Sequence, residues 1–288
     1  MSNNDNYHQL TRTFQRLSRF SHLSAIASWD MFTMMPPGGS KARGEALAEL
    51  SVLEHQLLTD PKVAMWISAA QQEDLNDVEQ ANLREMSRLH HQASLLPESL
   101  VEAKSLAGSR CEHAWRSQRP ANDWEGFSDN LKEVVKYSRE EALLRAEAKG
   151  CSPYDALLDI FEPGMTSAQL DNLFADVKSW LPDLLNKVVA KQSQQSLIAP
   201  VGPFPTAVQR ELGLETMAQL GFDFTAGRLD ISAHPFCGGV PEDVRITTRY
   251  DENELLSALF GVIHETGHAR YEQNLPHSWS GQPIALAR

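Results

Sequence analysis

The pattern in this sequence best able to do chemistry is His264-Glu265-Thr266-Gly267-His268, a match to HExxH. On a helix, residues four apart differ by about 40° around the axis and by one turn along it, so both imidazoles can face one point. That geometry suits two of the ligands of a zinc ion. Glu265 directly follows the first histidine on the helix and could take a proton from a water that the metal activates. The alternative is a pair of surface histidines on an ordinary helix.

A catalytic zinc site needs a third protein ligand. The long metzincin pattern would place Gly at 271 and His at 274, but the chain has Tyr271 and Asn274, so that class is excluded. Glu272 lies one turn beyond His268, and a straight helix carries it away from the point that the two histidines share. We therefore expect Glu272 to be a supporting or solvent-facing carboxylate. A Glu on a following helix is the remaining route, and the sequence offers no good candidate for it.

The elements that must position this motif are a helix and a small sheet. Asp251 is a plausible N-cap with Glu254 as its capping-box partner, which predicts the HExxH helix over about 252–274. Before it, two stretches of alternating apolar and polar residues flank turn-forming residues at 235–243. We expect these two strands to form an antiparallel hairpin over about 228–250.

The rest of the chain shows apolar residues at helical spacing. Residues 1–191 are predicted to form a helical region, in which Pro182 kinks or breaks the helix predicted over 167–190. Residues 192–205 read as an exposed connection, and 192–288 as a partial catalytic region. The predicted fold class is mainly α, a multi-helix zincin-like peptidase fold with one small antiparallel hairpin or sheet next to the HExxH helix.

Composition excludes several classes of protein. The 288 residues are 42% hydrophobic, and 38 acidic against 26 basic side chains give a formal charge of −12, which argues against nucleic acid as a partner. No apolar run is long enough to span a bilayer, and the polar first residues do not read as a signal peptide. Three widely spaced cysteines are typical of a reducing compartment. We expect a soluble, cytoplasmic protein.

Further motifs accompany HExxH in series. His234-Pro235-Phe236 precedes Asp243-Val244-Arg245-Ile246-Thr247, and Tyr271-Glu272-Gln273 follows the two histidines. Trp29-Asp30 stands near the N-terminus. With these HPF and DxRxT motifs, the sequence resembles the carboxypeptidase Taq (M32) metallocarboxypeptidases over essentially its whole length. Ordered motifs in series are far more specific than HExxH alone.

The resemblance implies a mostly helical, two-lobed homodimer with a deep groove, of which residues 1–191 form one wall. It implies release of C-terminal residues from peptides, with His264 and His268 as ligands of Zn²⁺ (or Co²⁺ as a substitute) and Glu265 as the base. His234 and Arg245 are candidates for binding substrate. Each has an alternative: a local hydrogen bond for His234, and for Arg245 an ion pair with a neighbouring aspartate.

The resemblance has one departure. Family members are longer and continue into an HES-type motif whose Glu is the third metal ligand, followed by an arginine-bearing motif and a GxxQDxHW motif. This sequence contains none of them. We therefore expect the N-terminal portion of such a protein, C-terminally truncated, with zinc weakly bound or absent. The alternative is a catalytically inactive remnant that acts only as a folded, self-associating helical module.

Overall fold

The computed structural model describes residues 5–196, 198 and 200–286, and helices account for most of them. The predicted fold class, mainly α with one small sheet beside the HExxH helix, is confirmed. The helices are α1 (Asp5–Thr33), α2 (Ser40–Thr59), α3 (Pro61–Ala70), α4 (Asp77–Ser94), α5 (Glu98–Gln118), α6 (Trp124–Lys149), α7 (Pro153–Phe161), α8 (Ser167–Gln192), α9 (Thr206–Gln219) and α10 (Leu255–Gln273). The strands are β1 (Gly227–Ile231), β2 (Cys237–Val240) and β3 (Asp243–Thr248).

The chain divides into two units, one within residues 5–138 and 203–286 and the other within residues 139–202. The boundary at 138/139 falls inside α6. The sequence-based prediction instead divides the chain at 191/192, into a helical region and a partial catalytic region. That division concerns function and remains a prediction. Across the described ranges, no helix is both long and apolar enough to cross a membrane.

Local signals explain where the helices of the first unit begin. Asn76 accepts hydrogen bonds from the backbone N–H groups of residues 78 and 79, and Glu79 bonds back to the Asn76 N–H, which makes a capping box at the start of α4. Asp60 caps α3, which begins with Pro61 at its first position. One apolar core is formed by α1, α3, α4 and the residue Leu75 just before α4. Its buried members are Tyr7, Leu10, Phe14, Leu17, Val63, Ile67, Ala70, Leu75, Leu83 and Met86.

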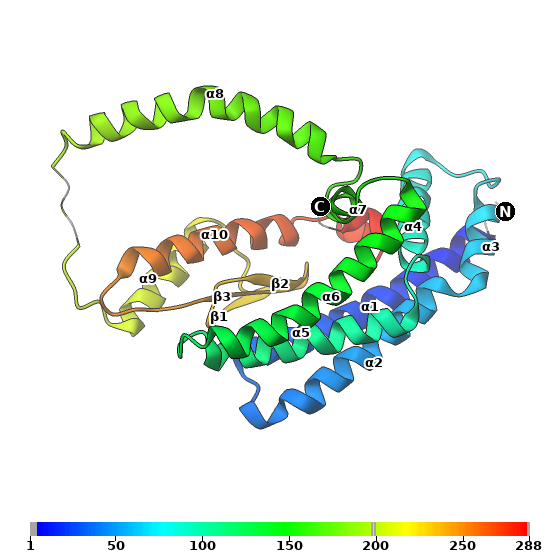
Figure 1. Ribbon diagram of the computed structural model, residues 1–288, viewed down its shortest axis with the longest axis horizontal. Coiled ribbons are helices and arrows are strands. Elements are labelled where there is room, and N and C mark those ends of the chain that lie inside the picture. The colour runs from blue at the N-terminus through cyan, green and yellow to red at the C-terminus, as the bar shows by residue number, and fades with distance from the viewer. Residues whose placement is uncertain (1–4, 197, 199, 287–288) are drawn as a thin grey trace. The chain divides into compact units, whose positions relative to one another are not determined.

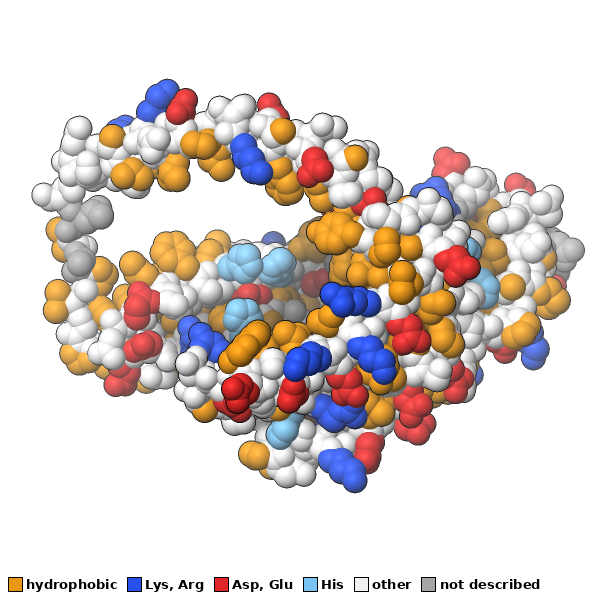
Figure 2. Space-filling view, in the orientation of Figure 1, with side chains coloured by type: hydrophobic (Ala, Val, Ile, Leu, Met, Phe, Trp, Pro, Cys, Tyr) orange, Lys and Arg blue, Asp and Glu red, His pale blue; other side chains and the backbone are white. Residues whose placement is uncertain are grey.

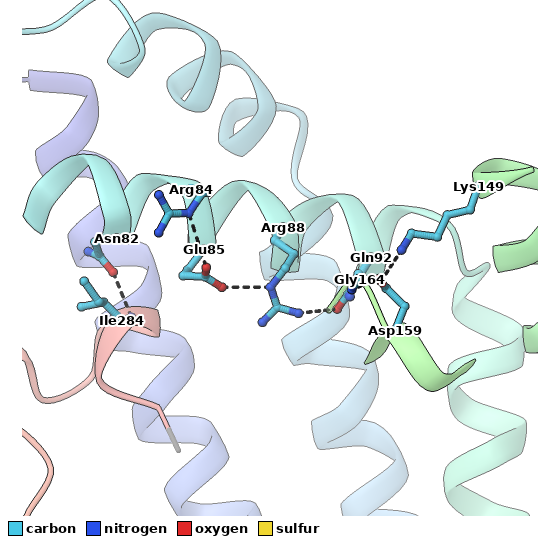
Figure 3. Close-up of polar contacts among 9 residues, drawn as sticks. All are labelled: Asn82, Arg84, Glu85, Arg88, Gln92, Lys149, Asp159, Gly164 and Ile284. Atoms are coloured by element: carbon cyan, nitrogen blue, oxygen red, sulfur yellow. Dashed lines mark hydrogen bonds and ion pairs between the residues drawn. The ribbon is translucent and has the colours of Figure 1, made fainter. Parts of the chain in front are cut away.

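The segment after α10 is tied to this helical core by one buried side chain. Asn82 is fully buried, and its Oδ1 accepts from the backbone N–H of Ile284 at 3.2 Å (Figure 3). The Asn82 amide donates to the Tyr7 hydroxyl at 3.1 Å and to the Gln282 side chain at 3.2 Å. A buried amide satisfied on both sides holds residues 282–284 against α1 and α4, although some 200 residues separate them from Asn82 in sequence.

The sheet corrects the predicted strand pairing. β1 pairs with β3 in parallel, with Leu229 opposite Ile246, and β2 pairs with β3 antiparallel, so the strand order is β1-β3-β2. The predicted antiparallel hairpin of the two longer strands is therefore wrong. The stretch predicted as a turn supplies β2, since Gly238 and Gly239 pair within the sheet. Gly239 has φ +114°, and a Cβ there would collide with the backbone of Asp243, so the tight return to β3 requires glycine.

A second core joins this sheet to α9 and α10. Its members are Met217, Phe222, Leu229, Val244, Ile246, Val262 and Ala269. Helix α10 packs on the sheet and against α9 (Figure 1). The face of α10 that carries Val262 and Ala269 is thus fixed in the core, and the opposite face is left exposed.

The second unit contains the end of α6, α7 and α8. Asp159 on α7 forms an ion pair with Lys149 and accepts a hydrogen bond from the Gly164 N–H at 2.9 Å (Figure 3). Helix α8 begins at a capping box between Thr166 and Gln169 and runs without interruption through Pro182, so the predicted break there is wrong. No residue of α8 is buried. Water can therefore satisfy the carbonyl that Pro182 leaves without a donor, which explains why the helix continues.

Candidate metal centre

The HExxH motif lies on α10, whose N-terminus differs slightly from the prediction. The helix begins at Leu255 with Glu254 as its N-cap, and the Glu254 carboxylate accepts from the Ser257 N–H at 2.7 Å. Asp251 instead accepts from the Asn253 N–H at 2.8 Å, inside the preceding turn. The predicted cap at Asp251 is therefore wrong. The turn between β3 and α10 is three residues longer than the capping pattern predicted, so the helix begins at Leu255 and not at 252.

The two histidines meet as predicted. His264 and His268 are exposed, their ring centroids are 4.9 Å apart and their planes are nearly perpendicular at 81°. Their Nε2 atoms lie 3.3 Å apart. Two nitrogen ligands of a tetrahedral zinc ion, each at about 2.0–2.1 Å from the metal, lie about 3.3–3.4 Å apart. The spacing of the two ring nitrogens therefore fits a shared metal ion. Figure 2 shows histidine side chains gathered over α10.

Glu265 differs from the histidines in its surroundings. It is only 7% exposed, whereas both imidazoles face outward. Burial raises the pKa of the nearby Cys237 to about 12, and the carboxylates of Glu265 and Glu272 add to that rise by disfavouring the thiolate. Burial raises the pKa of Glu272, and the nearby His268 opposes that rise. The centre thus combines two exposed imidazoles with two partly or wholly buried carboxylates.

The third ligand is missing from the part of the chain that the structure describes. There, no group of three His, Cys, Asp or Glu side chains is arranged to hold a metal ion. Glu272 lies near His268 but does not complete such a group. The described residues therefore bring together two imidazole nitrogens and, next to them on α10, a buried carboxylate.

The HPF motif forms a loop that packs against α10. A Cβ on Gly261 would lie 3.7 Å from the ring of Pro235, and Gly261 stands one turn before His264 on the same face of the helix. His234 itself is exposed. The sequence thus singled out a loop beside the candidate metal centre, and whether the His234 imidazole binds substrate stays a prediction.

Two hydroxyl groups that the sequence analysis did not single out hold this loop. The Ser232 hydroxyl lies 2.5 Å from the His234 carbonyl and 2.7 Å from the Thr247 hydroxyl. Thr247 accepts from the Phe236 N–H at 3.1 Å and donates its own backbone N–H to the Phe236 carbonyl at 2.9 Å. Thr247 is the last residue of the DxRxT motif. The motif and the period-two pattern of the strand marked this position in the sequence, but neither indicated that the Thr247 hydroxyl holds the HPF loop.

Arg245 is engaged in a two-point ion pair. Its Nε and Nη2 donate to the two carboxylate oxygens of Asp243 at 2.9 and 2.7 Å, which lowers the pKa of Asp243. The guanidinium also lies over the Trp29 ring, 4.5 Å from its centroid. Arg228 lies over the same ring at 5.2 Å and is itself paired with Asp230. These contacts support the ion-pair alternative for Arg245 over direct binding of substrate.

The mainly helical fold and the paired histidines on α10 are typical of one class of metallopeptidases, and comparison with known proteins identifies the family. The family model described as Carboxypeptidase Taq (M32) metallopeptidase matches residues 9–288. The chain belongs to this family. It is 38% identical to thermostable carboxypeptidase 1 of Thermus thermophilus, covering 94% of this chain and 56% of that protein. It is 33% identical to carboxypeptidase 1 of Bacillus subtilis, covering 94% of this chain and 54% of that protein.

Solved structures agree. Trypanosoma cruzi metallocarboxypeptidase 1 is 47% identical with a TM-score of 0.86, and the match covers 99% of this chain and 58% of that one. The structure titled BsuCP is 32% identical with a TM-score of 0.90, covering 96% of this chain and 56% of that one. The chain therefore spans little more than half the length of the relatives it matches. The family is one of metallopeptidases, and membership in it implies a divalent metal.

Proposed function

We propose that this chain is the metal-binding and base-carrying part of a zinc-dependent metallocarboxypeptidase, which releases C-terminal amino acids from peptides. The observation that carries the proposal is the 3.3 Å spacing of the His264 and His268 Nε2 atoms beside the buried carboxylate of Glu265. His264 and His268 would hold the metal, Zn²⁺ or in its place Co²⁺. The third ligand would come from a segment that corresponds to the part of the relatives outside the match.

Each residue has a separate role in this proposal. A bound divalent metal would supply Lewis-acid chemistry, polarising the scissile carbonyl and acidifying a water molecule. Glu265 would take a proton from that water at a carboxylate oxygen and pass it to the departing amine. The HPF loop, pinned by Ser232 and Thr247, would position the substrate next to α10.

The proposed compartment and metal state follow the same reasoning. Three free cysteines, Cys111, Cys151 and Cys237, support a reducing, cytoplasmic location. With two protein ligands, we expect the 288-residue chain to bind zinc weakly and to turn over peptides poorly.

The test separates ligand from base. Zinc binding is measured by titration calorimetry for the 288-residue chain and for the variants Glu265→Gln and His264→Ala, with His91→Ala, an exposed histidine on α4, as the control. We expect Glu265→Gln and His91→Ala to retain the affinity of the parent chain and His264→Ala to lose it. If Glu265→Gln released zinc as readily as His264→Ala, the roles assigned to ligand and base would be wrong.

Activity is measured in a chain that includes the remaining segment. Residues 1–288 are joined to the unmatched part of a relative, and release of C-terminal residues is followed with added Zn²⁺ or Co²⁺. Glu265→Gln should lower kcat by about 10²–10⁴-fold while the metal stays bound. Zinc retained in stoichiometric amounts by the 288-residue chain alone, with turnover that depends on His264, would show that the remaining segment is not needed.

A second candidate function is favoured by α8. Its apolar side chains gather along one side of the helix and are exposed (Figure 2). The exposed set on α8 comprises Leu173, Phe174, Trp180, Leu181, Leu184, Leu185, Val188 and Val189. An exposed apolar stripe of this kind supports a folded module that associates with another copy as a homodimer without turning over peptide. The zinc titration with His264→Ala distinguishes the two functions, because self-association needs no histidine.

A further inference from the structure

A cavity outside the metal centre opens beside the HPF loop, within the first unit. Its volume is about 760 Å³, inside the range of about 300–1,000 Å³ that is typical of small-molecule sites. It lies among the end of α1, α5, the first half of α6 and the loop after β1. Its lining residues are Phe32, Gly108, Cys111, Glu112, Trp115, Arg116, Phe127, Val134, Ser232, Ala233, His234 and Phe236. We call it the HPF pocket.

The walls of the HPF pocket are mainly aromatic and aliphatic. Four aromatic rings, those of Phe32, Trp115, Phe127 and Phe236, contribute to them, and Phe32 packs edge-on against Phe236 with ring centroids 5.5 Å apart. Because aromatic side chains prefer edge-to-face and offset contacts, such walls favour a further ring as the occupant.

The charged groups in the wall compensate one another. Arg116 Nε donates to Glu112 at 3.1 Å and Nη1 donates to the Met31 carbonyl at 2.5 Å, while the guanidinium lies over the Phe32 ring at 5.2 Å. The positive charge of Arg116 is therefore matched by Glu112 inside the wall. Because the Arg116–Glu112 pair is neutral overall, a neutral group fits this environment better than a carboxylate does. Arg116 Nη2 is buried and has no hydrogen-bond partner within the described residues, so it remains available to a carbonyl oxygen of the occupant.

The HPF pocket and the candidate metal centre share the HPF loop. His234 and Phe236 line the pocket, and Pro235 between them packs against Gly261 of α10, one turn before His264. The hydroxyls of Ser232 and Thr247 fix this loop. The same loop therefore borders both sites. A peptide bound at His264 and His268 would lie on one side of the HPF loop, and the apolar pocket opens on the other side.

We propose that the HPF pocket receives a large apolar side chain, preferably aromatic, of the peptide substrate. The proposal rests on the proposed carboxypeptidase function for the identity of its ligand as a peptide, and the binding it predicts needs no metal. It makes Gly108 of α5 a position that sets specificity, because a side chain at this residue would occupy the pocket. A Cβ on Gly108 meets no atom within 4 Å, so the helix can accept a larger residue there.

The test is a binding experiment on the metal-free 288-residue chain in the presence of EDTA. The probe is N-acetyl-4-fluoro-L-phenylalaninamide, which is neutral, and its ¹⁹F line width reports binding. We expect the line to broaden with the parent chain and unlabelled N-acetyl-L-phenylalaninamide to reverse the broadening, whereas N-acetyl-L-aspartamide leaves it unchanged.

Two leucine variants on α5 locate the binding. Gly108→Leu fills the pocket and should weaken probe binding at least tenfold, and leucine also favours the helix over glycine. Ser99→Leu adds the same side chain at an exposed position of α5 and should leave binding unchanged. Failure of the parent chain to bind the probe, or equal binding by Gly108→Leu, would overturn the proposal whatever the zinc titration shows.

A second measurement needs no variant. N-acetyl-4-benzoyl-L-phenylalaninamide is photo-crosslinked to the parent chain and the attachment points are found by mass spectrometry. Crosslinks within residues 108–134 and 232–236 are expected. Crosslinks confined to other segments would overturn the assignment even if Gly108→Leu proved unable to fold.

Discussion

Cys237 shows how the surroundings of the candidate metal centre alter the chemistry of one residue. It lies on β2, beside the two carboxylates of α10, and burial together with those carboxylates raises its pKa to about 12. The reactive form of a cysteine is the thiolate. At pH 8 only about one Cys237 side chain in ten thousand is ionised, so this thiol is chemically inert although it stands next to the site.

We predict that one thiol of the native chain reacts readily with Ellman's reagent at pH 8, and that this thiol is Cys151. Cys151 is exposed, whereas Cys111 is buried with a raised pKa and Cys237 has a pKa of about 12. Cys151→Ser should remove the rapid phase, and the denatured parent chain should release three equivalents. Because the folded-state pKa of Cys237 is raised, its thiolate fraction and reactivity increase only as the pH rises toward 12.

The control is Cys237→Ala, which should leave the rapid phase unchanged. One rapidly reacting equivalent in Cys151→Ser at pH 8 would contradict the proposed environment of Cys237.

At the scale of elements, the contact between α1 and the sheet depends on a stack around Trp29. The ring is 7% exposed, and the guanidinium groups of Arg228 on β1 and Arg245 on β3 lie 5.2 and 4.5 Å from its centroid. Each arginine is held by an aspartate two residues away on its own strand. Because β3 also packs against α10, this stack connects the first helix of the chain to the sheet that supports the metal centre.

We predict that Trp29→Ala lowers the free energy of unfolding by about 3–5 kcal/mol, the usual cost of removing a large buried aromatic side chain. Trp29→Phe should cost about 1–2 kcal/mol, since a ring still faces both guanidinium groups. The indole Nε1 has no hydrogen-bond partner within the described residues, so phenylalanine loses no hydrogen bond. The measurement is urea denaturation followed by circular dichroism.

Trp124→Ala is the matched control, because Trp124 is 67% exposed and its loss should cost no more than about 0.5 kcal/mol. Equal effects of Trp29→Ala and Trp124→Ala would show that the stack does not stabilise the contact between α1 and the sheet.

At the scale of the whole molecule, α8 is the element whose sequence and surroundings disagree most. A 26-residue helix with apolar residues along one side normally buries that side, yet no residue of α8 is buried. We predict that the 288-residue chain associates through this side of α8, so that light scattering after gel filtration gives a mass above the monomer value of 32.1 kDa.

The variants for this prediction differ only in the face of α8 that they charge. Leu181→Glu with Leu184→Glu places two charges on the apolar side and should shift the mass toward that of the monomer. Asn172→Glu with Asn186→Glu adds the same charge on the opposite side of the helix, where helical periodicity places both residues, and should leave association unchanged. Equal masses for the two double variants would exclude α8 as the associating surface.

The features of this protein that local geometry controls could be predicted from the order of its residues. The helical character of the chain follows from the spacing of its apolar residues. The convergence of His264 and His268 follows from their separation by four residues on one helix, and this geometry does not depend on what packs around the helix. The HPF and DxRxT motifs were recognised as residues, but their contacts were not predictable from their spacing.

Which distant segments meet could not be predicted in this way, because it depends on the packing of the folded chain. Strand β1 pairs with β3 in parallel because β2 forms within the glycine-rich connection between them, and alternation of residue types does not encode strand direction. Trp29 reaches Arg245 across more than 200 residues, and the HPF pocket joins α5 to a loop more than 100 residues away. Such contacts depend on how whole faces pack, so no local pattern in the sequence specifies them.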